Sequence, residues 1–349
     1  MHLDDEKIKA VLVETILLTG ISGFLAKHCA AKLLNAGYAV RGSVRRLDRT
    51  DEVRGALQQH LDDPAALDRL TFVALDLTAD AGWAEALTGV SALIHTASPF
   101  PISQPKNPDD LIRPALDGTL RALRAAKAAG VKRVVLTSST VAVLGGHDAR
   151  QKDESDWFDP DGPGASAYAR SKTLAERAAW AFVKDEAPEM LLTVINPGFI
   201  VGPPMDGNFG SSIGVVRRFL RGKDPMLPAV GFPVVDVRDV AEMHLRALQR
   251  PATAGKRYLA VAGSMWMYDM GRVLKAAYPE RRIPTRIAPK FVLRILALFD
   301  AEIRSVLSEV GKMEQVSNAR AVAEMDMQFI PPDEALRAAA QVLVDQKLV

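Results

Sequence analysis

Cysteine is nearly absent from this chain of 349 residues, because Cys29 is the only one. A single cysteine cannot form an internal disulfide, which favours a reducing compartment, and we expect the protein to be cytoplasmic. Cys29 lies in an apolar stretch, so a buried side chain is expected there, without a reactive thiol.

Several features that mark particular protein classes are also missing. The six histidines show no metal-ligand spacing, so we expect no metal site. The net charge of +2 gives no reason to expect binding to nucleic acid or to a membrane surface. The N-terminal region does not resemble a signal peptide. The apolar segment 291–299 is shorter than the roughly 20 residues that cross a bilayer, and an amphipathic helix is expected there.

The first two thirds of the chain alternate short apolar strands with helices. We expect strands at 15–18, 38–44, 70–75, 92–95, 134–137 and 191–195. Helical spacing of apolar residues predicts helices at 24–35, 111–129 and 168–183. Alternation of this kind is typical of right-handed βαβ units. The predicted fold class is therefore α/β, with a Rossmann doubly wound parallel sheet.

The pattern changes after Pro197. Residues 198–232 are rich in Gly and Pro, which predicts a loop-rich wall over a pocket. Residues 234–248 indicate a strand and a helix that return the chain to the Rossmann sheet. From Met265 onward the chain is predicted to be mostly helical. We expect a nucleotide-binding Rossmann domain (1–197 and 234–262) and a smaller, mostly helical C-terminal substrate domain (198–233 and 263–349).

A glycine turn follows the first strand, where Thr19-Gly20-Ile21-Ser22-Gly23 leads into Phe24 and Leu25. Glycines let backbone N–H groups approach a pyrophosphate, and the dipole of the next helix favours the same anion. The spacing is GxxGxxA, with Ala26 last, so the position between strand and helix carries the prediction. An ordinary strand-to-helix turn is the alternative.

The end of the second strand indicates which dinucleotide binds. NAD enzymes place an acid about 20 residues after the loop to bind the ribose 2′-hydroxyl. Here the strand ends in Arg45-Arg46, and the first acid is Asp48. A guanidinium at Arg45 can hold a 2′-phosphate, which favours NADP(H), although a solvated arginine pair is the alternative. Arg41 should point to the other face, and Asp76 could accept a hydrogen bond from adenine or cap a helix.

Tyr168 and Lys172 are spaced YxxxK and share one face of a predicted helix. A neighbouring ammonium and a nicotinamide cation would lower the pKa of the Tyr168 phenol, which could then exchange a proton with a carbonyl oxygen. Thr137-Ser138-Ser139-Thr140 ends the fifth strand, at the edge where open sheets bind ligands. Each motif alone occurs by chance, and their order along the chain carries the prediction.

Together these motifs resemble the extended short-chain dehydrogenase/reductases. The resemblance is strongest to the branch with dihydroflavonol reductases, cinnamoyl-CoA reductases and yeast-type aldehyde and methylglyoxal reductases. The matching stretches are TGISGFLAKH (19–28), VRGSVR (40–45), DL (76–77), HTASP (95–99), NP (107–108), VKRVVLTSS (131–139), YARSKTLAE (168–176), NPGFIVGP (196–203) and VDVRDVAEMH (235–244).

The resemblance implies NADPH-dependent, reversible reduction of an aldehyde or ketone to an alcohol. It implies a Ser–Tyr–Lys triad, which maps onto Ser139, Tyr168 and Lys172, with Ser138 or Thr140 as alternatives to Ser139. The cofactor contacts expected from the motifs and the resemblance are Thr19, Gly20, Ser22, Gly23, Phe24, Leu25, Arg45, Asp76, Leu77, Thr96, Ala97, Ser98, Thr137, Tyr168, Lys172, Pro197, Gly198 and Ile200.

Two positions depart from the plant dihydroflavonol reductases. They usually have glycine at the position of Ala26, and an asparagine that reads flavonoid hydroxyls where this chain has Leu144. A less polar aldehyde or ketone is therefore expected as the small-molecule partner. Pocket walls are expected at Phe100, Leu144, Met205 and Phe209, each of which could equally belong to the core.

Three alternatives stay open. One is an NAD-dependent nucleotide-sugar epimerase or dehydratase, which Arg45 disfavours. A hydroxysteroid-type dehydrogenase is the second. A non-catalytic NADP-sensing binding protein is the third, and the intact Tyr168–Lys172 pair argues against it. A monomer or a homodimer is expected.

Overall fold

The computed structural model describes residues 13–98, 107–145, 150–162, 165–299, 304 and 307–349. Its main sheet has the order β3-β2-β1-β4-β5-β6-β9, and all neighbours are parallel. The strands are β1 (Thr15–Thr19), β2 (Ala39–Val44), β3 (Leu70–Ala74), β4 (Ala92–His95), β5 (Arg133–Thr137), β6 (Leu191–Pro197) and β9 (Lys256–Ala260). All six predicted strands are present, and the predicted α/β Rossmann fold is confirmed.

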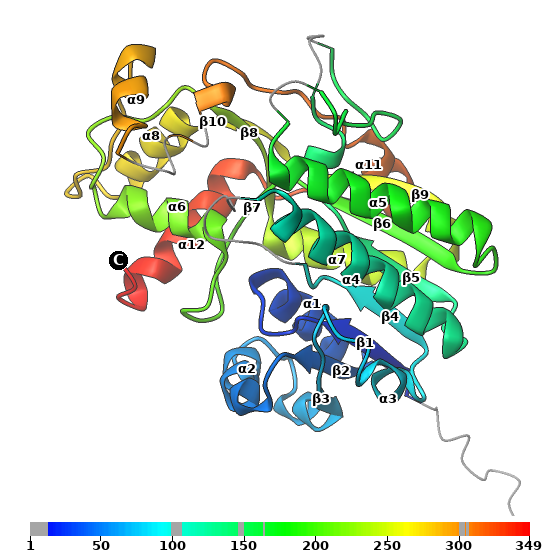
Figure 1. Ribbon diagram of the computed structural model, residues 1–349. Helices are drawn as coiled ribbons and strands as arrows, with labels where there is room; N and C mark the ends of the chain where they lie inside the picture. The colour runs from blue at the N-terminus through cyan, green and yellow to red at the C-terminus, as the bar shows by residue number, and fades with distance from the viewer. Residues whose placement is uncertain (1–12, 99–106, 146–149, 163–164, 300–303, 305–306) are drawn as a thin grey trace, which may run out of the picture.

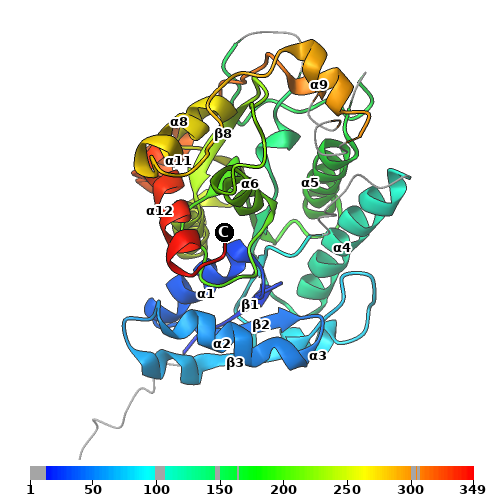
Figure 2. The ribbon, with the colours of Figure 1, turned by 90° about the vertical axis from the view of Figure 1, so that its left-hand side faces the viewer.

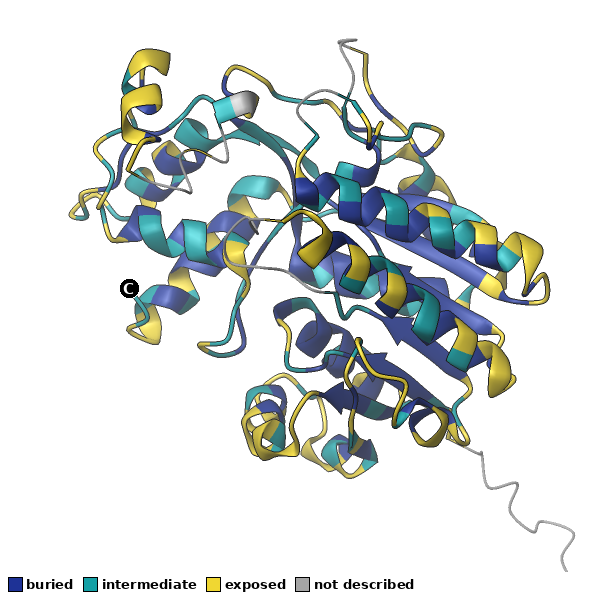
Figure 3. Ribbon diagram, in the orientation of Figure 1, coloured by how far each residue is buried: buried dark blue, intermediate teal, exposed yellow. Residues whose placement is uncertain are grey.

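Helices cover both faces of this sheet (Figure 1). The helices of this part are α1 (Phe24–Asn35), α2 (Thr50–Gln58), α3 (Trp83–Leu87), α4 (Asp109–Ala128), α5 (Ala167–Asp185), α7 (Val237–Gln249) and α11 (Ala319–Met325). Side chains alternate along each strand, so Ile16 and Leu18 pack with α1 and α7, whereas Leu17 packs with α4 and α5. Both faces are therefore apolar, and the sheet is the most deeply buried layer (Figure 3).

A second lobe is built around a three-stranded sheet with the order β10-β8-β7. Its elements are β7 (Phe199–Val201), α6 (Ser211–Leu220), β8 (Gly231–Asp236), β10 (Gly263–Trp266), α8 (Met267–Ala277), α9 (Lys290–Leu296) and α12 (Pro332–Asp345). Short 3-10 helices lie at Leu47–Arg49, Pro64–Arg69, Thr140–Ala142, Pro251–Thr253 and Leu307–Glu309. The last helix, α12, packs against α6 and α8 in both views (Figures 1 and 2).

Turns and loops make up most of the segment 198–232, around β7, α6 and the start of β8. In its described residues the lobe is mostly helical, with α6, α8, α9 and α12 beside three short strands. One expectation was wrong, because the strand predicted within 234–248 does not return to the Rossmann sheet. The strand at 231–236 pairs with β7 and β10, and it is β9 that returns to the Rossmann sheet beside β6. Val234 and Val235 are fully buried, as residues of a Rossmann strand would be, so their apolar pattern could not tell the two sheets apart. The domain boundaries otherwise stay a prediction.

Candidate active site

The turn after β1 has the backbone shape that a close approach to a phosphate requires. Gly20 has φ +69°, and a Cβ built on it would lie 3.1 Å from the Ala97 Cβ. The Gly20 N–H donates to the Ser43 hydroxyl at 3.0 Å, and the Gly23 N–H donates to the Gly20 carbonyl at 2.9 Å. Gly23 then precedes α1, whose first N–H groups have no helical acceptor. This cradle fits a dinucleotide pyrophosphate.

The ends of β1 and β4 are held together beside this turn. The Thr19 hydroxyl accepts the N–H groups of Thr96 and Ala97, each at 3.1 Å, and the Thr96 hydroxyl donates to the Thr19 carbonyl at 2.6 Å. Because its acceptor sites are used in this way, the Thr19 hydroxyl donates to Nδ1 of buried His95 at 2.9 Å. The predicted residues Thr19, Thr96 and Ala97 thus border the point where the sheet order reverses, where ligands of this fold bind.

The end of β2 presents Arg45 to solvent. Arg45 acts on the exposed Asp76, whose pKa is lowered chiefly by hydrogen bonds from Thr78 and, to a smaller degree, by this arginine. By contrast, the Arg41 guanidinium donates to the carbonyls of Ala86 and Thr88, as its predicted position on the other face suggested. Arg46 pairs with Asp48 on the surface. Arg45 is therefore the arginine of this strand placed toward the predicted adenine-side residue.

The three hydroxyls at the end of β5 point to different partners. Thr137 donates to Nε2 of His244, because Nδ1 of that buried histidine bonds the Val240 carbonyl. The Ser138 hydroxyl donates to the Glu176 carboxylate at 2.6 Å. Ser139 is hydrogen-bonded to the phenol of Tyr168. The structure therefore brings Ser139 to the predicted catalytic tyrosine, while Thr137 and Ser138 turn elsewhere.

Helix α5 positions the YxxxK pair. Ser166 caps the helix by accepting the Ala169 N–H at 3.1 Å, so the first turn is fixed where Tyr168 lies. Tyr168 is half-buried, and Lys172, one turn later, is 9% exposed. Desolvation raises the pKa of Tyr168, while its hydrogen bond with Ser139 lowers it. Burial lowers the pKa of Lys172 to about 8, and Glu176 acts in the opposite direction.

The YxxxK motif suggested a lowered pKa for Tyr168, but the protein without cofactor does not lower it. In this structure desolvation outweighs the hydrogen bond from Ser139 in setting the pKa of Tyr168. A positively charged nicotinamide would lower the pKa of Tyr168 only when the cofactor is bound.

A small cavity of about 10 Å³ lies beside Lys172. Its lining includes Lys172, Glu176, Ser138, His95 and Ser98. Burial, and to a smaller degree Lys172, lowers the pKa of His95 to about 3, so the imidazole is neutral. His95 Nε2 is buried, with no hydrogen-bond partner among the described residues. The cavity thus joins the predicted serine loop, the YxxxK helix and the end of β4.

Several further predicted cofactor residues surround the same edge of the sheet. Phe24 and Leu25 pack into the cores with their side chains. Leu77 lies against Gly118, and Ile200 packs between two cores. Pro197 is the last residue of β6 and Gly198 follows it; a Cβ on Gly198 would meet the Pro233 carbonyl oxygen at 2.4 Å. The Gly198 N–H donates to the Ala260 carbonyl.

The three predicted pocket walls that the structure describes all pack against apolar clusters. Met205 is 8% exposed and belongs to the core around α1 and α7. Phe209 packs partly on the second lobe under the Arg217 guanidinium. Leu144 packs partly against Val143, Leu259 and Val316. Phe100 lies outside the described residues. These four positions stay predictions for the pocket.

Two buried groups next to the site were missed. Glu176 is fully buried and bonds Ser138, Asn196, Trp180 and Arg257. Lys27 of α1 is buried and pairs with Asp206, while Asn208 donates to the carbonyl of Ser22 in the glycine turn. Glu176, Asn196 and Lys27 all lie in stretches that carry the family resemblance, but an apolar pattern gives no sign of such polar partners.

Neither a metal cluster nor a membrane span is found in the part of the chain that the structure describes. No group of three or more His, Cys, Asp or Glu side chains lies close enough there to hold a metal ion. None of the described helices combines the length and apolarity that a membrane crossing demands.

Comparison with known proteins agrees with this geometry. The model of the "NAD dependent epimerase/dehydratase family" matches residues 16–262. The chain is 33% identical over 300 residues to ketoreductase azaE of Aspergillus niger, covering 80% of this chain and 87% of that protein. It is 33% identical over 284 residues to cinnamoyl-CoA reductase 1 of Petunia hybrida, covering 80% and 82%.

A solved structure gives the same result. Yeast methylglyoxal/isovaleraldehyde reductase Gre2, complexed with NADPH, superimposes with a TM-score of 0.79 at 25% identity, covering 96% of this chain and all of that one. The expected resemblance is confirmed. This chain belongs to the NAD-dependent epimerase/dehydratase family of the extended short-chain dehydrogenase/reductases and is an oxidoreductase related to its reductase branch.

Proposed function

We propose that this protein reduces an aldehyde or ketone to an alcohol with NADPH. The observation that carries the proposal is the contact of Ser139 with Tyr168, one helical turn from buried Lys172, at the ligand-binding edge of a Rossmann sheet. The glycine cradle at Gly20 lies on the same edge. A serine and a phenol that bond each other can bond one carbonyl oxygen placed between them.

NADPH, when bound, supplies the hydride. The chain's own residues handle the oxygen and the proton. Ser139 donates a hydrogen bond that orients the substrate oxygen, and Tyr168 gives its phenolic proton to that oxygen as charge develops there. Lys172 is protonated below its pKa of about 8, and its positive charge stabilises the phenolate that remains. The alcohol oxidation in reverse uses the same groups with the proton moving back to Tyr168.

The preference for NADPH over NADH rests on Arg45. It is exposed at the end of β2, beside Asp76, and no carboxylate occupies the strand end where NAD enzymes bind the ribose hydroxyls. A guanidinium binds a 2′-phosphate with charge-assisted hydrogen bonds. The NADPH of the Gre2 complex supports the same choice. The predicted cofactor residues from Thr19 to Ile200 are proposed to line this site.

The substrate is proposed to be a carbonyl compound with an apolar body. Leu144 cannot hydrogen-bond a polyhydroxylated flavonoid, and it lies five residues after Ser139. The relatives named above as a ketoreductase and a cinnamoyl-CoA reductase support carbonyl reduction in general. A panel of aldehydes, ketones and β-ketoesters, each assayed with NADPH and NADH, would identify the preferred class.

The direct test is Tyr168→Phe, which removes the proton donor and keeps the ring. We expect kcat for carbonyl reduction to fall by about 100-fold or more, with the Kd for NADPH changed little. Tyr38→Phe is the matched control, because Tyr38 packs partly on the core near α1, away from the site. If Tyr168→Phe kept a rate close to that of the wild-type protein, the proposal would be wrong.

A further inference from the structure

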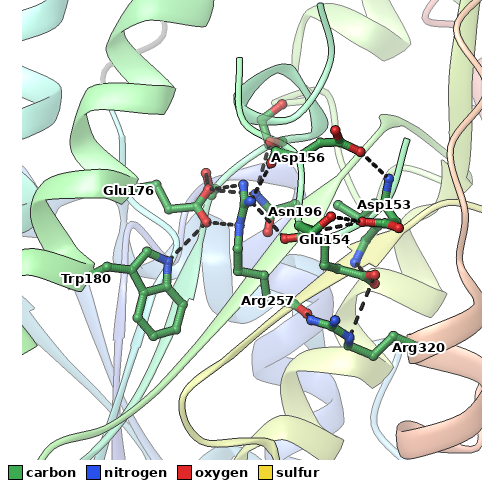
Figure 4. Close-up of polar contacts among 12 residues, drawn as sticks. Asp153, Glu154, Asp156, Glu176, Trp180, Asn196, Arg257 and Arg320 are labelled. Atoms are coloured by element: carbon green, nitrogen blue, oxygen red, sulfur yellow. Dashed lines mark hydrogen bonds and ion pairs between the residues drawn. The ribbon is translucent and has the colours of Figure 1, made fainter. Parts of the chain in front are cut away.

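We propose that Glu176 is a positioning residue for this reaction, which holds the serine loop in place and supports the positive charge of Lys172. The inference rests on the proposed function. Glu176 lies on α5 one turn after Lys172, and its side chain is fully buried. Figure 4 shows its carboxylate surrounded by donors that come from several segments.

Glu176 connects three elements that carry the site. Its Oε2 accepts from the Ser138 hydroxyl at 2.6 Å and from Asn196 Nδ2 at 2.7 Å. The same Asn196 amide also donates to the backbone carbonyl of Ser139 at 3.1 Å. The carboxylate therefore fixes the side chain before Ser139 directly and the main chain of Ser139 through one amide. Without it, the contact of Ser139 with Tyr168 would lose its support.

Arg257 on β9 closes the network from the opposite side. Its Nε donates to Glu176 at 2.5 Å, and its Nη1 donates to the carbonyls of Glu154 and Asp156. The guanidinium also stacks on the Trp157 ring, 3.8 Å from its centre. Figure 4 shows Arg257 reaching between Glu176 and the segment 153–156. The charge of the buried Glu176 carboxylate is thus balanced by Arg257, whose guanidinium is held in place by two backbone carbonyls and the Trp157 ring.

Among the described residues, Glu176 is the charged group that acts on Lys172. Glu176 and Lys172 line the same cavity, together with neutral His95, and Tyr168 lies one turn before Lys172. Glu176 raises the pKa of Lys172 against the effect of burial. The positive charge of Arg257 partly cancels the negative charge of Glu176. Removing the Glu176 charge therefore leaves the positive charge of Arg257 uncompensated near Lys172. The lysine should then lose its proton at lower pH.

The test compares Glu176→Gln with the wild-type chain. The first readout is the pKa of Lys172 by ¹⁵N-lysine NMR titration in the protein without cofactor, with Lys172→Met to assign the signal. We expect that pKa to fall by about one pH unit. The second readout is the pH profile of carbonyl reduction, whose alkaline limb should move by the same amount. We also expect kcat to fall about 10- to 100-fold with little change in the KM for NADPH, because only the reacting geometry is disturbed.

Glu154→Gln is the matched control. Glu154 is a buried carboxylate of the same network that pairs with Arg320 and accepts the Leu259 N–H, and its side chain does not bond the serine loop. It should leave both the Lys172 pKa and the pH profile unchanged. An unchanged Lys172 pKa in Glu176→Gln, or an equal shift in Glu154→Gln, would overturn the proposal.

Glu176→Asp covers the case in which the glutamine variant does not fold. It keeps the charge but withdraws the carboxylate from Ser138 and Asn196. We expect the Lys172 pKa to stay close to the wild-type value while kcat falls. Wild-type kcat in this variant would refute the positioning role. A wild-type protein that reduces no carbonyl would refute the proposed function instead, and the NMR result would still decide the link between Glu176 and Lys172.

Discussion

The ion pair of Lys27 with Asp206 should respond very differently to loss of one partner or the other. The Lys27 side chain is 1% exposed, whereas that of Asp206 is 19% exposed. Lys27 also donates to the Asn208 carbonyl at 3.2 Å. Asp206→Ala therefore leaves an ammonium in a site that water does not reach, with the Asn208 carbonyl as its remaining hydrogen-bond partner among the described residues. Lys27→Met leaves a carboxylate that still accepts the Asn208 N–H at 2.9 Å and touches solvent.

The difference in burial between Lys27 and Asp206 sets the expected loss of stability for each variant. Breaking a buried pair so that one charge stays behind costs about 3–5 kcal/mol, which we expect for Asp206→Ala. Per-residue unfolding entropies convert this into a fall in Tm of about 4–7 °C for a chain of this length. For Lys27→Met we expect about 1–2 kcal/mol, close to the loss of single hydrogen bonds. Replacing both residues with apolar ones should recover part of the loss.

The pH dependence gives a second check. Burial lowers the pKa of Lys27, and Asp206 raises it, so removing Asp206 lowers it further. The folded protein then binds its proton less tightly than the unfolded chain, and stability rises with pH. The loss in free energy of unfolding that Asp206→Ala causes, relative to the wild-type protein, should therefore become smaller between pH 7 and about pH 10.

The assay is urea unfolding followed by tryptophan fluorescence at both pH values. Arg113→Ala is the control, because Arg113 forms an exposed pair with Asp109 and should change stability by less than about 0.5 kcal/mol. Equal losses for Asp206→Ala and Lys27→Met, or a deficit that does not depend on pH, would refute this reasoning.

Three further predictions concern the cofactor and the proton. Arg45→Ala should raise the KM for NADPH about 10- to 100-fold and leave that for NADH unchanged, in line with a lost charge-assisted hydrogen bond; an equal change for both cofactors would contradict the role of Arg45. Gly20→Ala should abolish NADPH binding in a fluorescence titration, because the added Cβ meets Ala97 at 3.1 Å. Gly37→Ala, also at positive φ but with no described atom beyond its chain neighbours within 4 Å of the added Cβ, should only lower the Tm. Carbonyl reduction should fall as pH rises through about 8, where Lys172 loses its charge, and a flat profile up to pH 10 would contradict this.

The parts of the fold that the sequence predicted are those with a strong local pattern. The runs at β1, β4 and β5 are short and apolar on both faces, which is typical of central parallel strands. The glycine turn and the YxxxK pair were recognisable because their chemistry depends on fixed spacing. In each case residues a few positions apart contain the whole pattern.

The sequence did not predict which strands pair with β8. β8 carries the same buried valines as a Rossmann strand, but it pairs with β7 and β10 of the small sheet. Burial on both faces determines that a segment becomes a strand. It does not determine which of two sheets the strand enters, because that depends on the path of the connection after Pro197.

The same limit explains the choice among the hydroxyls at the end of β5. Thr137, Ser138 and Ser139 are alike in chemistry and adjacent in sequence, so local reasoning could not separate them. In the structure His244 engages Thr137, and Glu176 engages Ser138, from positions 107 and 38 residues away. Ser139 is the one left to meet Tyr168. For Ser138 to take the role of Ser139, Glu176 would have to release the Ser138 hydroxyl. The position of Glu176 thus determines which serine is the proposed catalytic one.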